Sequence, residues 1–155
     1  MGRKKILKLP NLFIGSSKEA ITVAEKLGKS LNRVSIPTLW NDDVFKLTKT
    51  SIESLFVQLD NSDFGIFIFN SDDKINIKGK KYTITRDNVI FELGLFMGKL
   101  GRERCIMMLP KKQSDLRIPT DLLGIVYSVY DHKKKTISNE EKRKIKVLIN
   151  SLGKI

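Results

Sequence analysis

The chain has 155 residues, of which 41% are hydrophobic and 30% charged, and its formal net charge is +12. This length suits a single domain, and the composition is too hydrophobic for a disordered chain. The longest apolar runs span only a few residues, whereas a membrane-spanning helix needs about 20, so no membrane partner is expected. The basic start, residues 1–8, lacks the apolar segment of a secretory signal, which predicts a cytoplasmic location.

The positive charge is concentrated at the two ends of the chain. Residues 1–10 hold four Lys or Arg and no acids, and residues 132–155 hold eight against two acids. Runs such as 133–135 and 142–144 are typical of the solvated face of a terminal helix, and no aromatic residues alternate with them as in a single-strand binder. A nucleic acid is therefore not the expected partner.

Hydrophobic periodicity predicts strands that alternate with helices. Strands are predicted at residues 11–14, 35–40, 64–69, 105–109 and 126–130, and helices at residues 20–31, 50–59, 86–100 and 138–152. Pro37 places the second strand at a sheet edge, and the run at 64–69, apolar on both faces, is typical of a central parallel strand. The polar stretch 70–85 predicts a long surface loop, with or without a short hairpin. Cys105, in an apolar run, is expected to pack in the core.

Alternating strands and helices predict the α/β class, because right-handed crossovers bring successive strands into one parallel sheet with helices on both faces. By analogy with flavodoxin-like folds, we expect five strands in the order 2-1-3-4-5. The whole chain, 1–155, is then one domain, with a core over about 10–131 and a basic terminal helix over about 137–152. Ligands of such sheets bind beyond the carboxyl ends of the strands, near the switch between strands one and three.

One acid, Glu92, lies within the apolar helical stretch 86–101. The apolar residues of this stretch repeat at helical spacing, and Glu92 borders their stripe instead of facing bulk solvent. Spacing alone leaves two interpretations open. Glu92 is either the working carboxylate of an active site or a boundary acid paired with a cation such as Arg86 or Lys99.

Other polar residues give weaker signals. Adjacent acids at Asp72-Asp73 and Asp42-Asp43 invite a metal site, but neither pair has a third ligand at useful spacing, so solvated loops are the favoured interpretation. His132 follows the last predicted strand and precedes a lysine run, which favours a surface histidine over a member of a catalytic triad. No metal site is expected.

Several segments carry a resemblance to a known family. They are residues 12–17, Trp40 with 44–45, Asp63-Phe64, Asp72-Asp73, 86–101 and 118–124. Together they resemble the TIR-like domain of bacterial antiphage effectors controlled by cyclic nucleotides, as in the TIR-STING fusions of CBASS systems and the TIR effectors of Pycsar systems. The resemblance covers about residues 10–131, and the block RDNVIFELGLFMGKLG at 86–101 is long enough to be specific.

The resemblance implies an NAD⁺ glycohydrolase, which cleaves nicotinamide from NAD⁺ to give ADP-ribose or a cyclic form and so depletes the NAD⁺ of an infected cell. Glu92 stands at the position of the family's catalytic glutamate. A nearby carboxylate would stabilise the oxocarbenium-like state, and nicotinamide departs as a neutral group without a general acid. NAD⁺ is the substrate here, so no cofactor is expected.

The resemblance also implies that activity requires self-association through TIR domains. Relatives join this domain to a cyclic-nucleotide-sensing domain, STING-like or other, and residues 132–155 are too short to form one. The sensor is then a further part of a longer effector or a separate chain. The alternative is a non-catalytic TIR module that only assembles with other TIR domains.

Further residues are candidate substrate contacts: Ser16, Ser17, Trp40, Arg86, Asn88 and Asp121. The two serines offer backbone and hydroxyl donors at a helix N-terminus, or serve only as turn and cap. Arg86 would meet the pyrophosphate or order Glu92, or is a surface charge at the helix start.

The aromatic and acidic candidates also have two interpretations each. Trp40 would stack on a flat ring of the substrate, or it simply packs, which is the commoner role of a large aromatic side chain. Asp121 lies in a Pro-x-Asp-Leu motif and is expected to order a loop more often than it contacts NAD⁺.

Overall fold

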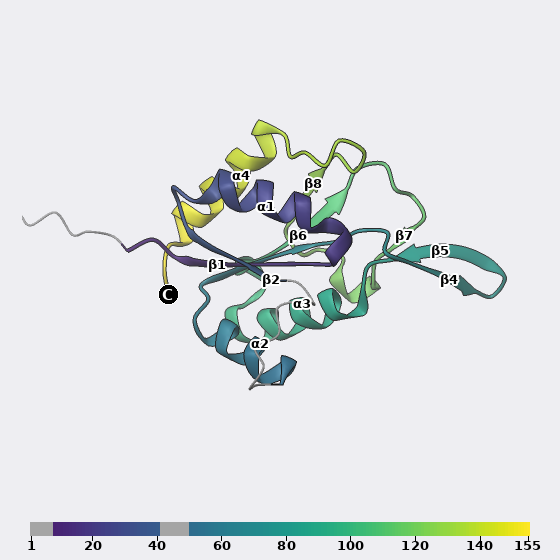
Figure 1. The fold of residues 1–155 in the computed structure, drawn as a ribbon, viewed down its shortest axis with the longest axis horizontal. Coiled ribbons are helices and arrows are strands. Elements are labelled where there is room, and N and C mark those ends of the chain that lie inside the picture. The colour runs from purple at the N-terminus through teal and green to yellow at the C-terminus, as the bar shows by residue number, and fades with distance from the viewer. Residues whose placement is uncertain (1–7, 41–49) are drawn as a thin grey trace, which may run out of the picture.

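The computed structural model describes residues 8–40 and 50–155, and its centre is a five-stranded parallel sheet (Figure 1). In spatial order the strands are β2 (Ile36–Trp40), β1 (Asn11–Ser16), β3 (Phe64–Ile68), β6 (Cys105–Pro110) and β8 (Tyr127–Tyr130). The predicted α/β class and strand order 2-1-3-4-5 are confirmed, with β2 at an edge as Pro37 indicated. The predictions for residues 41–45 lie outside the described residues.

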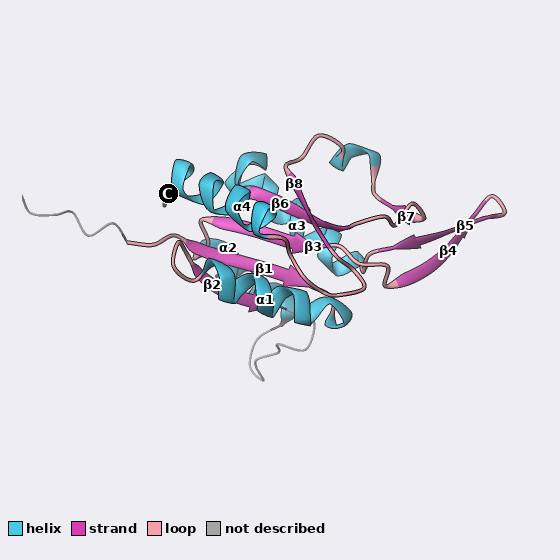
Figure 2. Cartoon of the chain, turned by 90° about the horizontal axis from the view of Figure 1, so that it is seen from above, coloured by secondary structure: helices cyan, strands magenta, loops and turns pink. Residues whose placement is uncertain are grey.

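Helices cover both faces of the sheet (Figures 1 and 2). They are α1 (Ile21–Leu31), preceded by the short η1 (Lys18–Ala20), α2 (Ser51–Asp60), α3 (Asp87–Leu100), followed by η2 (Arg102–Arg104), the short η3 (Thr120–Leu122), and α4 (Asn139–Leu152). The pair α1 and α4 covers one face, and the pair α2 and α3 covers the other. Within 8–40 and 50–155, no helix has the length and hydrophobicity to cross a bilayer.

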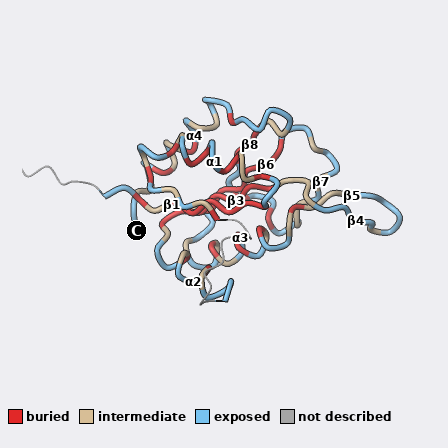
Figure 3. Tube along the Cα trace, viewed as in Figure 1, coloured by how far each residue is buried: buried red, intermediate tan, exposed pale blue. Residues whose placement is uncertain are grey.

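The two faces bury different side chains. The face under α1 and α4 is mainly aliphatic, with Leu12, Ile14 and Leu27 at its centre. The face under α2 and α3 is rich in aromatic rings and includes Phe13 and Phe67. Figure 3 shows that β1, β3 and β6 are buried throughout the middle of the molecule, as expected for central strands. Cys105 is fully buried, which confirms its expected place in the core.

Residues 70–85 take the alternative with a short hairpin that the sequence left open. They form a hairpin of β4 (Asp73–Ile77) and β5 (Lys80–Ile84), and β7 (Leu116–Arg117) pairs with β5 to make a second, three-stranded sheet. The turn is made by Lys78 and Gly79, whose φ angles of 50° and 81° suit a two-residue hairpin turn. The hairpin extends beyond the main sheet (Figure 2), so it buries little apolar surface and leaves only a weak sequence pattern.

Candidate functional site

Glu92 lies on the buried face of α3, at the carboxyl edge of the main sheet. The helix packs Val89, Leu93 and Phe96 against the sheet, each at most 1% exposed, and Glu92 is itself only 5% exposed. The indole Nε1 of Trp40, the last residue of β2, donates a hydrogen bond to Glu92 Oε1 at 3.0 Å. The Glu92 carboxylate is thus buried among apolar side chains and is oriented by Trp40, a residue of the strand β2.

Gly15 makes room for this carboxylate at the end of β1. A Cβ at this position would lie 2.9 Å from Glu92 Oε2, 3.1 Å from the Phe13 ring and 3.2 Å from the Phe67 ring. Real Cβ atoms essentially never approach another atom as closely as the first of these distances. Gly15 therefore allows the close approach of a side chain to the strand backbone.

The cations considered as partners of Glu92 are engaged elsewhere. Lys99 pairs with Asp60, and Arg86 pairs with Glu19 at 3.1 Å and with Asp73 at 3.2 Å. Arg86 and Lys99 are therefore partners of other carboxylates. A hydrogen bond from its own backbone amide lowers the pKa of Glu19, and the Arg86 guanidinium lowers this pKa further.

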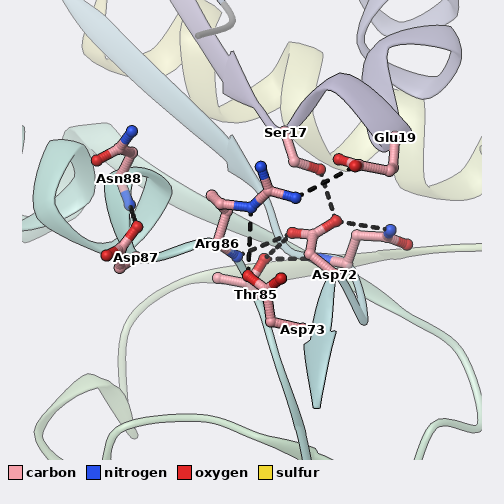
Figure 4. Close-up of polar contacts among 9 residues, drawn as sticks. Ser17, Glu19, Asp72, Asp73, Thr85, Arg86, Asp87 and Asn88 are labelled. Carbon is pink, nitrogen blue, oxygen red and sulfur yellow. Dashed lines mark hydrogen bonds and ion pairs between the residues drawn. The ribbon is translucent and has the colours of Figure 1, made fainter.

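A second polar cluster adjoins the start of α3 (Figure 4). The Asp72 carboxylate accepts hydrogen bonds from Ser17 Oγ at 2.7 Å, from Asn70 Nδ2 at 2.9 Å and from the Arg86 backbone amide at 2.8 Å. The predicted solvated loop is wrong for Asp72, because its carboxylate is surrounded by donors from three segments. Its neighbour Asp73 remains exposed.

The two candidate serines point in different directions. Side chains alternate along β1, so Ser16 lies on the aliphatic face with Leu12 and Ile14, opposite Gly15. Ser16 is 2% exposed, and Ser17 is fully buried with its hydroxyl on Asp72. Ser17 makes no side-chain capping bond to the helix that follows, so the expected cap does not form.

The remaining candidates are distributed along the same edge. The Trp40 ring is 8% exposed and lies 6.0 Å from the Phe13 ring, as the packing alternative expects. Asn88 is exposed in the first turn of α3, where its backbone N–H donates to Asp87 Oδ1 at 2.8 Å. Asp121 is exposed on η3, although the next residue, Leu122, packs in the aromatic cluster.

The structure therefore brings Trp40 to Glu92, and it brings Ser17 and Arg86 to Asp72. Sequence reasoning missed Asp72 as a shared acceptor and missed Glu19 of η1, which pairs with Arg86. Asp72 lay in one of the segments that carry the family resemblance but had no predicted contact, and no motif marked Glu19. Among the described residues, no group of three or more His, Cys, Asp or Glu is arranged to hold a metal ion.

Comparison of the sequence with known proteins finds a matching family model and similar effector proteins. The family model described as "CAP12/Pycsar effector protein, TIR domain" matches residues 11–132. "CD-NTase-associated protein 12" of Lachnospiraceae bacterium (strain RUG226) is 38% identical over 141 residues, which are 91% of this chain and 42% of that protein. "Pycsar effector protein BcPycTIR" of Burkholderia cepacia is 39% identical over 128 residues, which are 81% of this chain and 42% of that protein. The chain thus spans less than half the length of these relatives.

Proposed function

This chain belongs to the TIR-domain family of CAP12 and Pycsar effector proteins, and on that premise we propose that it is an NAD⁺ glycohydrolase that acts as an effector of antiphage defence. The observation that supports the activity is the buried Glu92 carboxylate, which Trp40 orients over Gly15 at the ligand-binding edge of the sheet. Ligands of doubly wound sheets bind at this edge, so the carboxylate lies where a substrate would enter.

The chemistry needs a fixed negative charge more than it needs a proton donor. As the bond between nicotinamide and ribose breaks, its electron pair moves to the nicotinamide nitrogen, which loses its positive charge. The ribose then carries oxocarbenium character, which a preoriented carboxylate in a water-poor site stabilises. Water that adds to the ribose, with loss of a proton, gives ADP-ribose, and attack by the adenine ring would give a cyclic product.

The other candidates receive supporting roles in this proposal. Trp40 orients the carboxylate through its indole N–H. Arg86 is one-third exposed, so its guanidinium is accessible to the diphosphate of NAD⁺. Ser16, Ser17, Asn88 and Asp121 remain predicted contacts along the edge. NAD⁺ is the substrate, and the proposal involves no further cofactor.

Activation is proposed to occur by self-association. The names of the relatives connect one group with a CD-NTase and the other with the Pycsar system. We propose that a cyclic-nucleotide-sensing part, in the same effector or in a partner chain, brings TIR domains of this kind together. Forced clustering through a fused oligomerisation domain should therefore replace the signal.

The test is nicotinamide release from NAD⁺ by the clustered protein, followed by chromatography. Glu92→Gln keeps the size of the side chain and removes its charge, so the rate should fall by about 10²–10³-fold. Glu103→Gln, an exposed glutamate on η2, is the matched control and should stay within about twofold of the unsubstituted protein. Undiminished release by Glu92→Gln would contradict the proposal.

The same assay separates the enzyme from the assembly module. If the unsubstituted protein clusters fully and still releases no nicotinamide, the domain acts only by assembling with other TIR domains. Size-exclusion chromatography of the clustered sample establishes that assembly has taken place.

A further inference from the structure

Asp72 joins three segments that reach the site from different strands (Figure 4). Ser17 follows β1, Asn70 follows β3, and Arg86 is the residue from which α3 begins. All three donate to the one carboxylate, at distances between 2.7 and 2.9 Å. The Thr85 hydroxyl adds a longer contact of 3.3 Å. A single side chain therefore ties together the loops that border the proposed site.

The helix that carries Glu92 has no cap of its own. Thr50 caps α2 and Ser138 caps α4 through their side chains, whereas Arg86, the N-cap of α3, makes no such bond. Asp72 takes this place from a distant part of the chain, because its Oδ2 accepts the Arg86 amide at 2.8 Å. A carboxylate at this end also interacts favourably with the helix dipole. Asp72 thus fixes where α3 begins, less than two turns before Glu92.

The same carboxylate determines how Ser17 can act. A serine hydroxyl has one proton and two lone pairs, and Ser17 gives its proton to Asp72 Oδ1. The oxygen is left as an acceptor. Because this proton is engaged and Ser17 is fully buried, the expectation that its hydroxyl would donate to a substrate does not hold in this geometry.

We propose that Asp72 is a positioning residue for this site. It holds the start of α3 in register with the segment after β1, and so places Glu92, and it fixes the orientation of the buried Ser17 hydroxyl. As far as the reaction is concerned, this inference rests on the proposed NAD⁺ glycohydrolase function. A misplacement of a catalytic group by about 1 Å costs on the order of 10²-fold in rate, which sets the size of the expected effect.

The first test is Asp72→Asn in the clustered full chain. The carboxamide of asparagine keeps the shape of the side chain. It offers only one acceptor oxygen, whereas the donors to Asp72 are now divided between two carboxylate oxygens. We expect kcat/KM for nicotinamide release to fall by about 10–100-fold, mainly through kcat, because Glu92 is displaced. Asp115→Asn, an exposed aspartate beside β7, is the matched control and should change kcat/KM by less than about twofold. A result within twofold for Asp72→Asn would overturn the proposal.

A double-mutant cycle distinguishes positioning from general destabilisation. Ser17→Ala should lower kcat, because the Asp72 carboxylate loses one of the donors that fix its position. In the Asp72→Asn background the same change should cost less than about twofold more, because the Ser17 hydroxyl is no longer oriented there. Effects that multiply fully would show that the two residues act independently and would overturn the link between them.

An NMR measurement tests the positioning without any activity. The Arg86 amide proton should shift upfield in Asp72→Asn, since it loses a carboxylate acceptor, and should keep its position in Asp115→Asn. If Asp72→Asn does not fold, Ser17→Ala carries the test, because removing one donor from the shared carboxylate should also shift this resonance. An unchanged resonance in the folded variants would overturn the proposal. Should the unsubstituted protein release no nicotinamide, the proposed function fails while this measurement still reports on Asp72.

Discussion

The two faces of the main sheet are built from the same strands but packed in different ways. Under α1 and α4 the core is mainly aliphatic, and branched side chains fill the space between sheet and helices. Under α2 and α3 the core is a cluster of rings, in which Phe96 lies 4.3 Å from Phe13 and 5.4 Å from Phe67, centroid to centroid. Glu92 is buried on this second face.

Two glycines on the strands make space for the rings and the carboxylate on the face under α2 and α3. A Cβ at Gly15 or at Gly65 would come within 2.9 or 2.7 Å of a side-chain atom, so rings and carboxylate lie directly on the strand backbone. Gly28, in the helix on the aliphatic face, has only ordinary contacts from 3.5 Å upward. The comparison teaches that the face under α1 and α4 is filled by ordinary packing. The face under α2 and α3 has glycines on its strands, which leave space for rings and for the buried Glu92 carboxylate.

The largest difference should appear between two variants that each add one methyl group, one on either face of the sheet. Gly15→Ala places Cβ against Glu92 Oε2, so we expect a loss of about 1–3 kcal/mol in the free energy of unfolding and about 10²-fold in nicotinamide release. Gly28→Ala should instead stabilise the protein by about 0.5–1 kcal/mol, because alanine favours the helix and meets no close contact. Urea unfolding and the NAD⁺ assay measure both. Equal responses of the two variants would show that the faces do not differ in this way.

A smaller effect should follow from removing the donor to Glu92. Trp40→Phe keeps an aromatic ring beside Phe13 but deletes the indole N–H. Because a hydrogen bond to a charged group contributes about 1.5–3 kcal/mol, kcat/KM should fall by roughly 10-fold or more. Tyr127→Phe, on the edge strand β8, removes a polar group from an aromatic residue that is 64% exposed, and it should have no effect. Full activity in Trp40→Phe would remove the orienting role of Trp40.

The smallest effect concerns pH, and it involves one buried residue on each face. Burial raises the pKa of the Cys105 thiol on the aromatic face to about 12, and burial, with a contribution from Asp72, also raises the pKa of Tyr130 on the aliphatic face. Both groups stay protonated longer in the folded state than in the unfolded state. The stability from Cys105 is therefore complete below about pH 9, the ordinary pKa of a thiol, and is lost as pH rises toward 12.

Urea unfolding between about pH 7 and pH 10.5 checks this expectation. Above pH 9 the free energy of unfolding should fall by up to about 1.4 kcal/mol per pH unit for one group. Cys105→Ala should lose most of this dependence and keep the part due to Tyr130. A Cys105→Ala variant with an unchanged alkaline slope would contradict the assignment to the thiol.

Much of the fold could be predicted because its signals are local. The apolar run 64–69 and the helical spacing of 86–100 depend on neighbouring residues, and both elements form close to the predicted bounds. Glu92 could be singled out for the same reason, as a charge bordering an apolar helical stripe. The hairpin 73–84 could be named only as one of two alternatives, because a solvated arm needs no apolar alternation to fold.

The contacts of the site could not be predicted, because they join residues far apart in the chain. Trp40 and Glu92 are 52 positions apart, and Ser17 and Asp72 are 55 apart. Asp72 looked like one of two equal acids in a polar stretch, and only the fold separates it from Asp73. Arg86 looked like a partner for Glu92, yet Glu19 and Asp73 are the carboxylates that it meets.

The sequence by itself determined the α/β class, the burial of Cys105 and the helix that carries Glu92, because hydrophobic periodicity is a property of short segments. The order of the main strands followed from analogy with flavodoxin-like folds. Only the tertiary structure decided which side chains of each strand join which cluster. It also decided that Gly15 leaves space for a carboxylate and that Asp72 accepts the amide of Arg86, the N-cap of α3, from a distant segment. These features depend on side-chain direction and on close approach between segments. Such distances are fixed when the sheet closes against its helices, and no short stretch of sequence encodes them.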